Sequence, residues 1–371
     1  MKNLKAWMLH RLQRCKVRRI CGTDKGERMK KIFILMILLV LFLSGCKPQE
    51  TIKDPDDEVI IEDPVIEPED PVDEIVFRSV FNGSEVDENI KYKAVAVMIE
   101  NSAAARPHSG IGVADIVYEI AVDGWQVSRF LAIFQSEFPS KVGPVRSARI
   151  PFVKIQLEWM LPFAHYGAAE TGLGNAYAII RNTKWPVRFD GVSGLNDDYY
   201  SRDTSRNAPH NAFFDAKASL VKIPELNFER RFEFDDIPST SSVFAATIHL
   251  DYSSINKVKY VYDSASMKYL RYINEKPMMD AYTNSQVSVS NIILLHAPHT
   301  AVEKYDYVLV DFISKGKAEY FIDGKYIVGT WSKSDEKAIT RYFDGQGAEI
   351  TLQPGNTWIQ VVSDRVKISF E

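Results

Sequence analysis

The sequence predicts an α/β domain with a mixed sheet and flanking helices, followed by a mostly antiparallel β domain. Three observations support this fold class. Between about residues 77 and 238, short apolar runs typical of buried strands alternate with helix-like stretches. Between residues 241 and 371, β-rich runs follow one another with glycine-containing turns between them. An apolar leader and an acidic, proline-rich segment precede both regions.

The leader has the three parts of a secretory signal. Lys30 and Lys31 precede the apolar run Ile32 to Leu43, and small residues follow it. The run is shorter than the roughly 20 apolar residues that a membrane-spanning helix needs. We therefore expect residues 1–45 to be a signal segment. Met29 is the expected true start, with a long cytoplasmic N-terminal region as the alternative.

The ending "LSGC" resembles the lipobox of bacterial lipoproteins, in which the cysteine is acylated and becomes the new N-terminus. This resemblance implies a lipid on Cys46 and a protein held at the extracytoplasmic face of the cell membrane. The alternative is an ordinary secreted protein. Cys15 and Cys21 lie before this point, so the exported part has no cysteine pair for a disulfide or a cysteine-based metal site.

Residues 46–76 are expected to form an extended tether, because Pro alternates with Asp and Glu and apolar residues are few. Residues 1–45 hold 11 Lys and Arg against 2 Asp and Glu, and residues 47–76 hold 2 against 12. Of the totals of 45 and 49, this leaves 32 basic and 35 acidic residues after the tether. A nearly neutral folded part gives no reason to expect nucleic-acid binding.

The expected α/β domain covers residues 77–238. Its apolar runs predict four strands and two helices in an order that fits a buried sheet with crossover helices. The strands are Lys93–Ile99, Asp115–Ala121, Arg129–Gln135 and Met160–His165, and the helices are Ile150–Leu157, with Pro151 in its first turn, and Gly174–Arg181.

The expected β domain covers residues 241–371. Asp323-Gly324, Asp344-Gly345 and Pro354-Gly355 are turn signals between its strands. The predicted strands are Ala246–Leu250, Lys257–Tyr262, Lys268–Ile273, Val287–Leu295, Tyr305–Val310, Ala318–Ile322 and Trp358–Val362.

Polar clusters at predicted strand ends supply the candidate ligand-binding residues. In open α/β sheets ligands gather where strands end and helices begin, and arginine offers a planar fork to phosphate or carboxylate. The clusters are "NSAAARPHSG", "GPVRSAR", "HYGAAE" and "RDTSRNAPHN". The candidate ligand-binding residues are Arg106, Arg146, Arg149, Arg202, Arg206 and Asn211.

The segment "GPVRSAR" reads as the opening of a helix with Arg146 and Arg149 in its first turn. Cations are unfavourable at the positive end of a helix dipole unless an anion is present, so this placement suggests an anion pocket to which Arg202 and Arg206 also contribute. The alternative is a set of structural ion pairs, for which Glu100, Glu119, Glu170 and Asp203 are available.

The candidate catalytic residues are His165, Glu170 and His210, since a carboxylate can orient an imidazole for acid–base work near neutral pH. A zinc site from His108, His165 and His210 is chemically allowed, but no closely spaced ligand pair supports it. We therefore expect no metal and no cofactor. Nucleotide-binding and hydrolase motifs are missing from the sequence, and nothing marks a base for Ser147.

Several stretches resemble the YerB-like lipoprotein family of Gram-positive bacteria. They are "RPHSGIGVADIVYEI", "RFLAIFQSEFPSKVGPVRSARIPFVKIQLEW", "HYGAAE", "RDTSRNAPHNAF", "GKAEYFIDGKYIVGTWSK" and "GAEITLQPGNTWIQVV". The resemblance implies a two-domain surface lipoprotein and assigns no catalytic residue. The order of elements around "VRSAR" is also similar to the LytR-CpsA-Psr phosphotransferases, which would give Arg146 and Arg149 a pyrophosphate and Asp115 a metal. The Arg-Asp pair of those enzymes does not follow "VRSA" here.

The sequence thus predicts a membrane-anchored extracytoplasmic lipoprotein that binds an anionic envelope component through an arginine-rich pocket. Two alternatives stay open. One is an envelope phosphotransferase or hydrolase acting on a phosphorylated or carboxylated substrate. The other is a scaffold that binds a protein partner.

Overall fold

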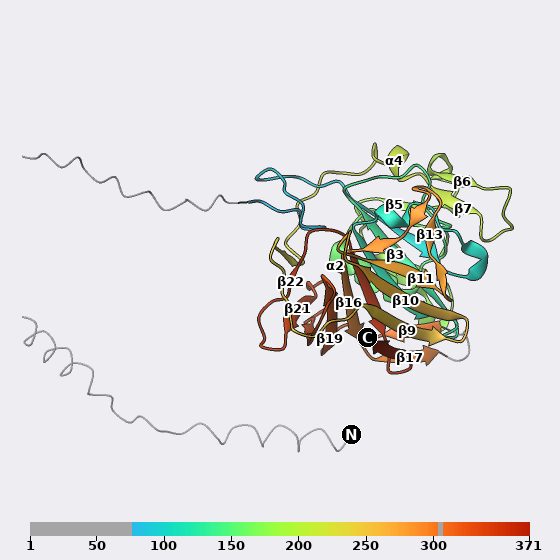
Figure 1. Cartoon of the computed structure of the whole chain (residues 1–371). Coiled ribbons are helices and arrows are strands. Elements are labelled where there is room, and N and C mark those ends of the chain that lie inside the picture. The colour runs from blue at the N-terminus through green and yellow to red at the C-terminus, as the bar shows by residue number, and fades with distance from the viewer. Residues whose placement is uncertain (1–75, 303–306) are drawn as a thin grey trace, which may run out of the picture. The chain divides into compact units, whose positions relative to one another are not determined.

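The computed structural model describes residues 76–302 and 307–371 (Figure 1). The expected signal segment, the expected lipidation site Cys46 and residues 46–75 of the expected tether lie outside the described residues. Within the described part of the chain, no helix is long and apolar enough to cross a membrane.

A ten-stranded mixed sheet is the centre of the fold. Its strand order is β21-β20-β19-β16-β23-β2-β3-β1-β4-β5. The pairs β2–β23, β23–β16, β1–β4 and β4–β5 are parallel, and the other neighbours are antiparallel. The strands are β1 (Val95–Glu100), β2 (Ile116–Val122), β3 (Val127–Phe134), β4 (Phe163–His165), β5 (Arg188–Asp190), β16 (Asn291–His296), β19 (Lys315–Ile322), β20 (Lys325–Ser332), β21 (Arg341–Asp344) and β23 (Thr357–Val362).

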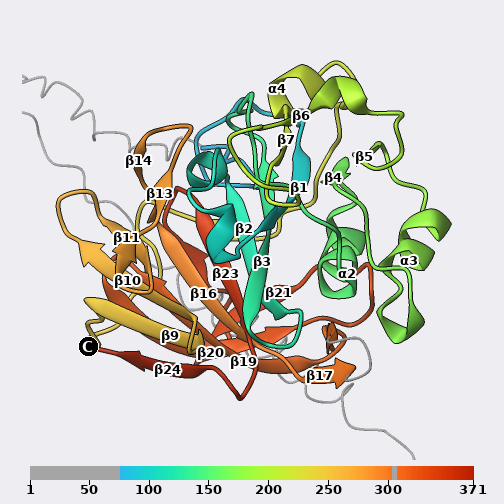
Figure 2. The ribbon, with the colours of Figure 1, turned by 90° about the vertical axis from the view of Figure 1, so that its right-hand side faces the viewer.

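Both faces of this sheet are covered, which explains why its central strands are apolar at successive positions. Met98 of β1 packs in one apolar cluster with Phe152 and Trp159 of the helix α2, whereas its neighbour Val97 packs in a second cluster with Tyr260 of a second sheet. Figure 2 shows α2 (Ile150–Trp159) and α3 (Ala176–Asn182) on one side of the long sheet, and β9 (Thr247–Ser253), β10 (Asn256–Asp263) and β11 (Lys268–Ile273) on the other. The α-helices are α2 (Ile150–Trp159), α3 (Ala176–Asn182) and α4 (Ala216–Ser219).

The second sheet has the strand order β12-β11-β10-β9-β24, with β15 also paired to β11. All of its pairs are antiparallel. Its strands are β9 (Thr247–Ser253), β10 (Asn256–Asp263), β11 (Lys268–Ile273), β12 (Lys276–Pro277), β15 (Ser288–Val289) and β24 (Lys367–Phe370). Two-stranded ribbons complete the fold: β6 (Tyr200–Arg202) with β7 (Ala212–Phe214), β8 (Glu233–Phe234) with β22 (Thr351–Leu352), β13 (Met279–Asp280) with β14 (Ser285–Gln286), and β17 (His299–Val302) with β18 (Tyr307–Val310).

The predicted fold class is confirmed: the N-terminal region contributes a mixed sheet with helices, and the C-terminal region consists mainly of antiparallel strands. One turn signal has a clear physical basis. Asp323 and Gly324 join β19 to β20 with φ values of 47° and 71°, the left-handed pair that a tight two-residue hairpin requires.

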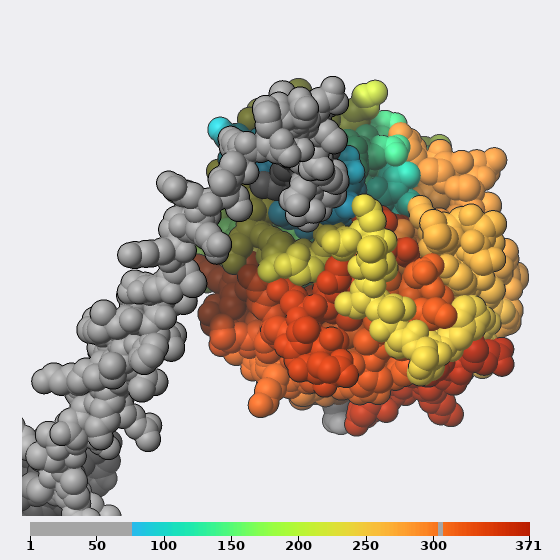
Figure 3. Space-filling view, turned by 60° about the vertical axis from the view of Figure 1, so that its left-hand side comes forward, coloured from blue at the N-terminus to red at the C-terminus, as the bar shows by residue number. Residues whose placement is uncertain are grey.

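The two regions share the ten-stranded sheet. The strand β23 belongs to the C-terminal region, yet it lies between β2 and β16 and is parallel to both. All six of its residues are buried, as expected for a central strand covered on both faces. The chain between β8 and β9, which connects the regions, runs along the surface (yellow in Figure 3). The predicted domain boundary near residues 238–241 therefore divides the sequence but not the ten-stranded sheet, to which both regions contribute strands. The boundary itself stays a prediction.

A buried ion pair joins the two sheets. Arg271 of β11 donates to Glu119 of β2 at 2.7 Å, and both side chains are fully buried. The other carboxylate oxygen of Glu119 accepts from Asn101 at 3.2 Å and from Ser128 at 2.5 Å. The guanidinium of Arg271 lies 4.6 Å from the ring centre of Trp358. These two charges therefore depend on one another, because water cannot reach either of them.

Candidate functional site

A cleft of about 420 Å³ opens beside the carboxyl end of β4, and we call it the arginine cleft. Two of the predicted arginines and one predicted acid reach it. It is lined by Val145, Arg146, Ser147, Tyr166, Gly167, Ala168, Glu170, Tyr177, Val192, Arg202, Pro209 and Ala212.

The segment before α2 is extended, which corrects the expectation that it opens the helix. Val145 donates its amide to Ala212 at 2.7 Å, and the Arg146 amide donates to Met98 at 3.1 Å. The helix begins at Ile150, with Arg149 as its N-cap residue. The two arginines therefore do not share a helical face, and the helix dipole is not what requires an anion. The predicted position of Pro151 in the first turn is confirmed.

Arg146 is partly neutralised from behind the cleft. Its Nε lies 3.4 Å from the carboxylate of Glu100, the last residue of β1, and its side chain is 27% exposed. Glu100 is itself buried and accepts from Ser102 at 2.8 Å and from His210 at 2.9 Å. This is the ion pairing that the sequence left open as an alternative. It holds Arg146 in place at the cleft wall but offsets its charge.

Arg202 differs from Arg146 because no carboxylate among the described residues pairs with it. It donates to the side-chain oxygen of Asn211 at 2.7 Å and to the hydroxyl of Tyr166 at 2.8 Å. Its guanidinium also lies 4.8 Å from the centre of the Tyr166 ring. These neutral contacts fix the position of the guanidinium and leave its positive charge available to a ligand.

Arg149 and Arg206 lie outside the arginine cleft. The expectation that they converge there with Arg146 and Arg202 is therefore wrong. Arg149 pairs with Asp123 at 2.9 Å, and Asp123 also accepts from Arg129 at 2.5 Å. Arg206 donates to the carbonyl oxygens of Ala105 and Pro107 at 3.0 and 2.8 Å, and its Nε is 4.0 Å from Asp203.

Arg106 lines a separate pocket, which is described below. Asp115, the acid suggested by the phosphotransferase likeness, is buried and accepts from the amides of Gln135 and Ser136 at 2.7 and 3.0 Å. It does not line the arginine cleft.

The predicted acid–base residues are not brought together as a catalytic set. His165 is fully buried behind the cleft wall, where it donates from Nδ1 to the carbonyl of Gly167 at 3.0 Å, and burial lowers its pKa. Glu170 lines the cleft but pairs with exposed Arg181 at 2.9 Å. His210 contacts Glu100 and is not a cleft-lining residue. These three side chains therefore do not form the general acid–base site that the sequence suggested.

Ser147 is the other lining residue of the arginine cleft whose chemistry the sequence raised. Ser147 donates its hydroxyl to the carbonyl of Tyr166 at 3.0 Å, and no base among the described residues accepts its proton. In residues 76–302 and 307–371, no three His, Cys, Asp or Glu side chains are grouped so that they could hold a metal ion. The guanidinium of Arg202 can contact an anionic group, and the rings of Tyr166 and Tyr177 can pack against the rest of a ligand.

Several residues that shape the cleft were not expected from the sequence. Tyr166 and Tyr177 form part of its wall, and Asp190 holds that wall by accepting from the Tyr177 hydroxyl at 2.8 Å and from the Gly167 amide at 3.2 Å. Tyr166 directly follows His165, one of the predicted catalytic residues, in "HYGAAE". Its position at the end of a predicted strand could have indicated that it lines the site. Asp190 ends a three-residue strand and left no such signal.

Comparisons with known proteins support the resemblance seen in the sequence. A family model described as "Protein of unknown function (DUF3048) N-terminal domain" matches residues 81–229, and the model of its C-terminal domain matches residues 248–359. The chain is 32% identical over 288 residues to "Putative lipoprotein YerB" of Bacillus subtilis (strain 168), across 73% of this chain and 82% of the relative. The crystal structure of the Bacillus subtilis YerB protein matches with a TM-score of 0.68 at 27% identity, and covers 79% of this chain and 99% of that chain.

Proposed function

Because the chain belongs to the DUF3048 family of YerB-like lipoproteins, we propose that it is anchored to the membrane through Cys46 and binds an anionic component of the cell envelope in the arginine cleft. The anchor is supported by the lipobox-like "LSGC" and by the name of the Bacillus subtilis relative. The extracytoplasmic location is supported by the secretory-signal pattern that precedes the cysteine.

The observation that carries the binding proposal is the state of Arg202. Its guanidinium is oriented by Asn211 and Tyr166 and has no carboxylate partner among the described residues. Arg146 contributes a second guanidinium to the same cleft, although Glu100 offsets part of its charge. A ligand with a phosphate or carboxylate would meet Arg202 as its main charged contact and the tyrosine rings as its walls.

The size and lining of the cleft favour a hydrophilic ligand. About 420 Å³ holds a small molecule or one unit of a polymer, and tyrosines with their hydroxyl groups can pack against a sugar ring while hydrogen bonding to it. We therefore expect phosphorylated sugars or muropeptide carboxylates to be the best ligand classes.

The test uses the chain with Cys46→Ser, which lacks the thiol to which the lipid would be attached. Glucosamine 6-phosphate, a short polyphosphate and a muropeptide are titrated into it by calorimetry. We expect Arg202→Ala to weaken binding of the preferred anion by about tenfold to a hundredfold, because a hydrogen bond to a charged group contributes about 1.5–3 kcal/mol.

The matched control is Arg188→Ala, an exposed arginine on β5 that does not line the cleft. It should leave the affinity unchanged. The proposal is refuted when none of the three probes binds, or when Arg202→Ala and Arg188→Ala bind the preferred probe equally well. Unchanged thermal unfolding of both variants would show that the fold is intact.

A further inference from the structure

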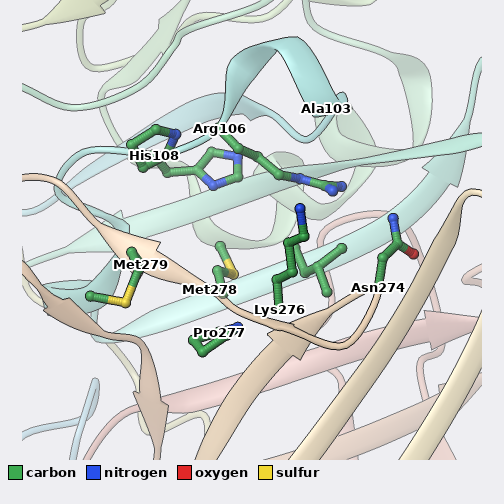
Figure 4. A pocket seen from close by; sticks show the side chains of 10 residues that line it. Ala103, Arg106, His108, Asn274, Lys276, Pro277, Met278 and Met279 are labelled. Atoms are coloured by element: carbon green, nitrogen blue, oxygen red, sulfur yellow. The ribbon is translucent and has the colours of Figure 1, made fainter.

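A second pocket, of about 520 Å³, lies between the short 3-10 helix Ala103–Ala105 and the hairpin that joins β11 to β12 (Figure 4). It shares no lining residue with the arginine cleft. We call it the hairpin pocket. Its lining residues are Ala103, Arg106, Pro107, His108, Ile273, Asn274, Lys276, Pro277, Met278 and Met279.

Two cations face the hairpin pocket from opposite walls. Figure 4 shows the side chains of Arg106 and Lys276 pointing into the space between the walls. Arg106 donates from one Nη to the backbone oxygen of Asn101 at 2.8 Å and to its side-chain oxygen at 3.3 Å. The Nε of Arg106 is buried and has no hydrogen-bond partner. In the described part of the chain, neither Arg106 nor Lys276 has a carboxylate partner.

The remaining ionisable group of the lining adds no negative charge. His108 is fully buried, and its Nε2 donates to the carbonyl of Glu100 at 2.7 Å. Burial lowers the pKa of His108 to about 3, so the ring is neutral at physiological pH. Burial and the nearby Arg271 also lower the pKa of Arg106, and the Glu119 carboxylate opposes this shift only in part.

Apart from Asn274, the rest of the wall is apolar. Ile273, Pro277, Met278 and Met279 line one side, and Met279 remains 41% exposed. Methionine side chains adapt to irregular apolar shapes, so two of them in sequence suit a flexible hydrocarbon chain. The volume lies in the range of small-molecule sites. A cationic mouth beside an apolar wall fits a ligand with a charged head and an apolar tail.

We propose that the hairpin pocket binds an anionic amphiphile, with a carboxylate or phosphate head between Arg106 and Lys276 and an alkyl tail against Ile273, Pro277, Met278 and Met279. This site does not depend on the proposed function of the arginine cleft, because the two sets of lining residues are different.

The probes separate the contributions of head and tail. Octanoate, decanoate and decyl phosphate are titrated into the Cys46→Ser chain by calorimetry below their critical micelle concentrations, with inorganic phosphate and decanol as head-only and tail-only probes. We expect saturable one-to-one binding of the anionic amphiphiles. Affinity should rise by about fourfold for each added methylene. Decanoate and decyl phosphate distinguish a fatty-acid source from a phospholipid-like source, and the tighter of the two identifies the head group.

Three variants locate the ligand. Lys276→Gln and Arg106→Gln should each weaken decanoate binding by about tenfold or more. Lys367→Gln, a change at an exposed lysine on β24 of the same sheet, is the matched control and should leave binding unchanged. Lys276 is exposed, so its replacement does not threaten folding even if Arg106→Gln perturbs the loop around Asn101.

Four results with the probes and the pocket variants would overturn the proposal, and a fifth concerns the arginine cleft. They are no saturable binding of any anionic amphiphile, decanol binding as tightly as decanoate, inorganic phosphate binding as tightly as decyl phosphate, and undiminished decanoate binding by Lys276→Gln. Loss of decanoate binding in Arg202→Ala would assign the probe to the arginine cleft and also refute the hairpin pocket as its site.

Discussion

Replacing Glu119 by glutamine should cost a large share of the stability of the fold. The change leaves the Arg271 guanidinium fully buried without a counter-ion, although the introduced amide would keep the size of the side chain and could still accept from Asn101 and Ser128. Breaking a buried pair by removing one partner costs about 3–5 kcal/mol. Since folded domains are stable by only about 5–15 kcal/mol in total, the variant should unfold at a much lower urea concentration.

A double-mutant cycle shows whether the loss comes from the pair. Arg271→Met alone should also destabilise, because it leaves the Glu119 carboxylate unpaired and removes the guanidinium from Trp358. Glu119→Gln combined with Arg271→Met removes both charges, so we expect it to be at least about 2 kcal/mol less destabilised than the sum of the single changes. Urea unfolding followed by tryptophan fluorescence measures all three free energies.

The matched control is the exposed pair of Glu170 and Arg181, whose side chains are 58% and 60% exposed. Glu170→Gln should cost at most about 1 kcal/mol, because water solvates either charge when its partner is lost. If Glu119→Gln costs as little as Glu170→Gln, or if the effects in the cycle are additive, the reasoning about mutual dependence of the buried charges is wrong.

Two further predictions concern the C-terminal strands. Burial alone would raise the pKa of Glu319, but hydrogen bonds from His296 and Tyr326 outweigh burial and lower the pKa from 4.5 to about 2. The ionised carboxylate therefore contributes about 3 kcal/mol to the free energy of unfolding above pH 4.5. This contribution is lost as the pH falls toward 2. Urea unfolding between pH 3 and 7 should show the deficit of Glu319→Gln shrinking as the pH falls, and a constant deficit would contradict this assignment. Gly329→Ala should destabilise by about 1–3 kcal/mol or more, because its Cβ would lie 1.9 Å from a carbonyl oxygen of the paired strand β21. Gly345→Ala, whose Cβ would meet its nearest atom at 3.3 Å, is the comparison, and equal thermal stability of the two variants would refute the steric argument.

The elements that sequence reasoning found are those whose signal is local. The apolar runs at Lys93–Ile99 and Asp115–Ala121 became β1 and β2 within two residues, and the helix predicted from Ile150 begins there. β20 and β24 were missed, and both alternate buried or half-buried residues with more exposed ones, which gives a weaker pattern than a continuous apolar run.

The ion-pair partners of charged residues that lie far apart in the chain could not be predicted from the sequence. Glu119 was considered as a partner for the N-terminal arginines, and it pairs with Arg271, 152 positions later. Arg149 pairs with Asp123, which the sequence gave no reason to select. Charge type and strand position predict that an arginine needs a partner, but the register of distant strands decides which carboxylate reaches it.

The position of β23 has a consequence for the order of folding. β2 and β16 are far apart in the chain, and they receive their common parallel neighbour only when the segment up to Val362 has joined them. Until then each of these strands has an unsatisfied edge flanked by apolar side chains, a form that invites aggregation or proteolysis. The ten-stranded sheet of this chain therefore stays divided until β23 has joined β2 to β16.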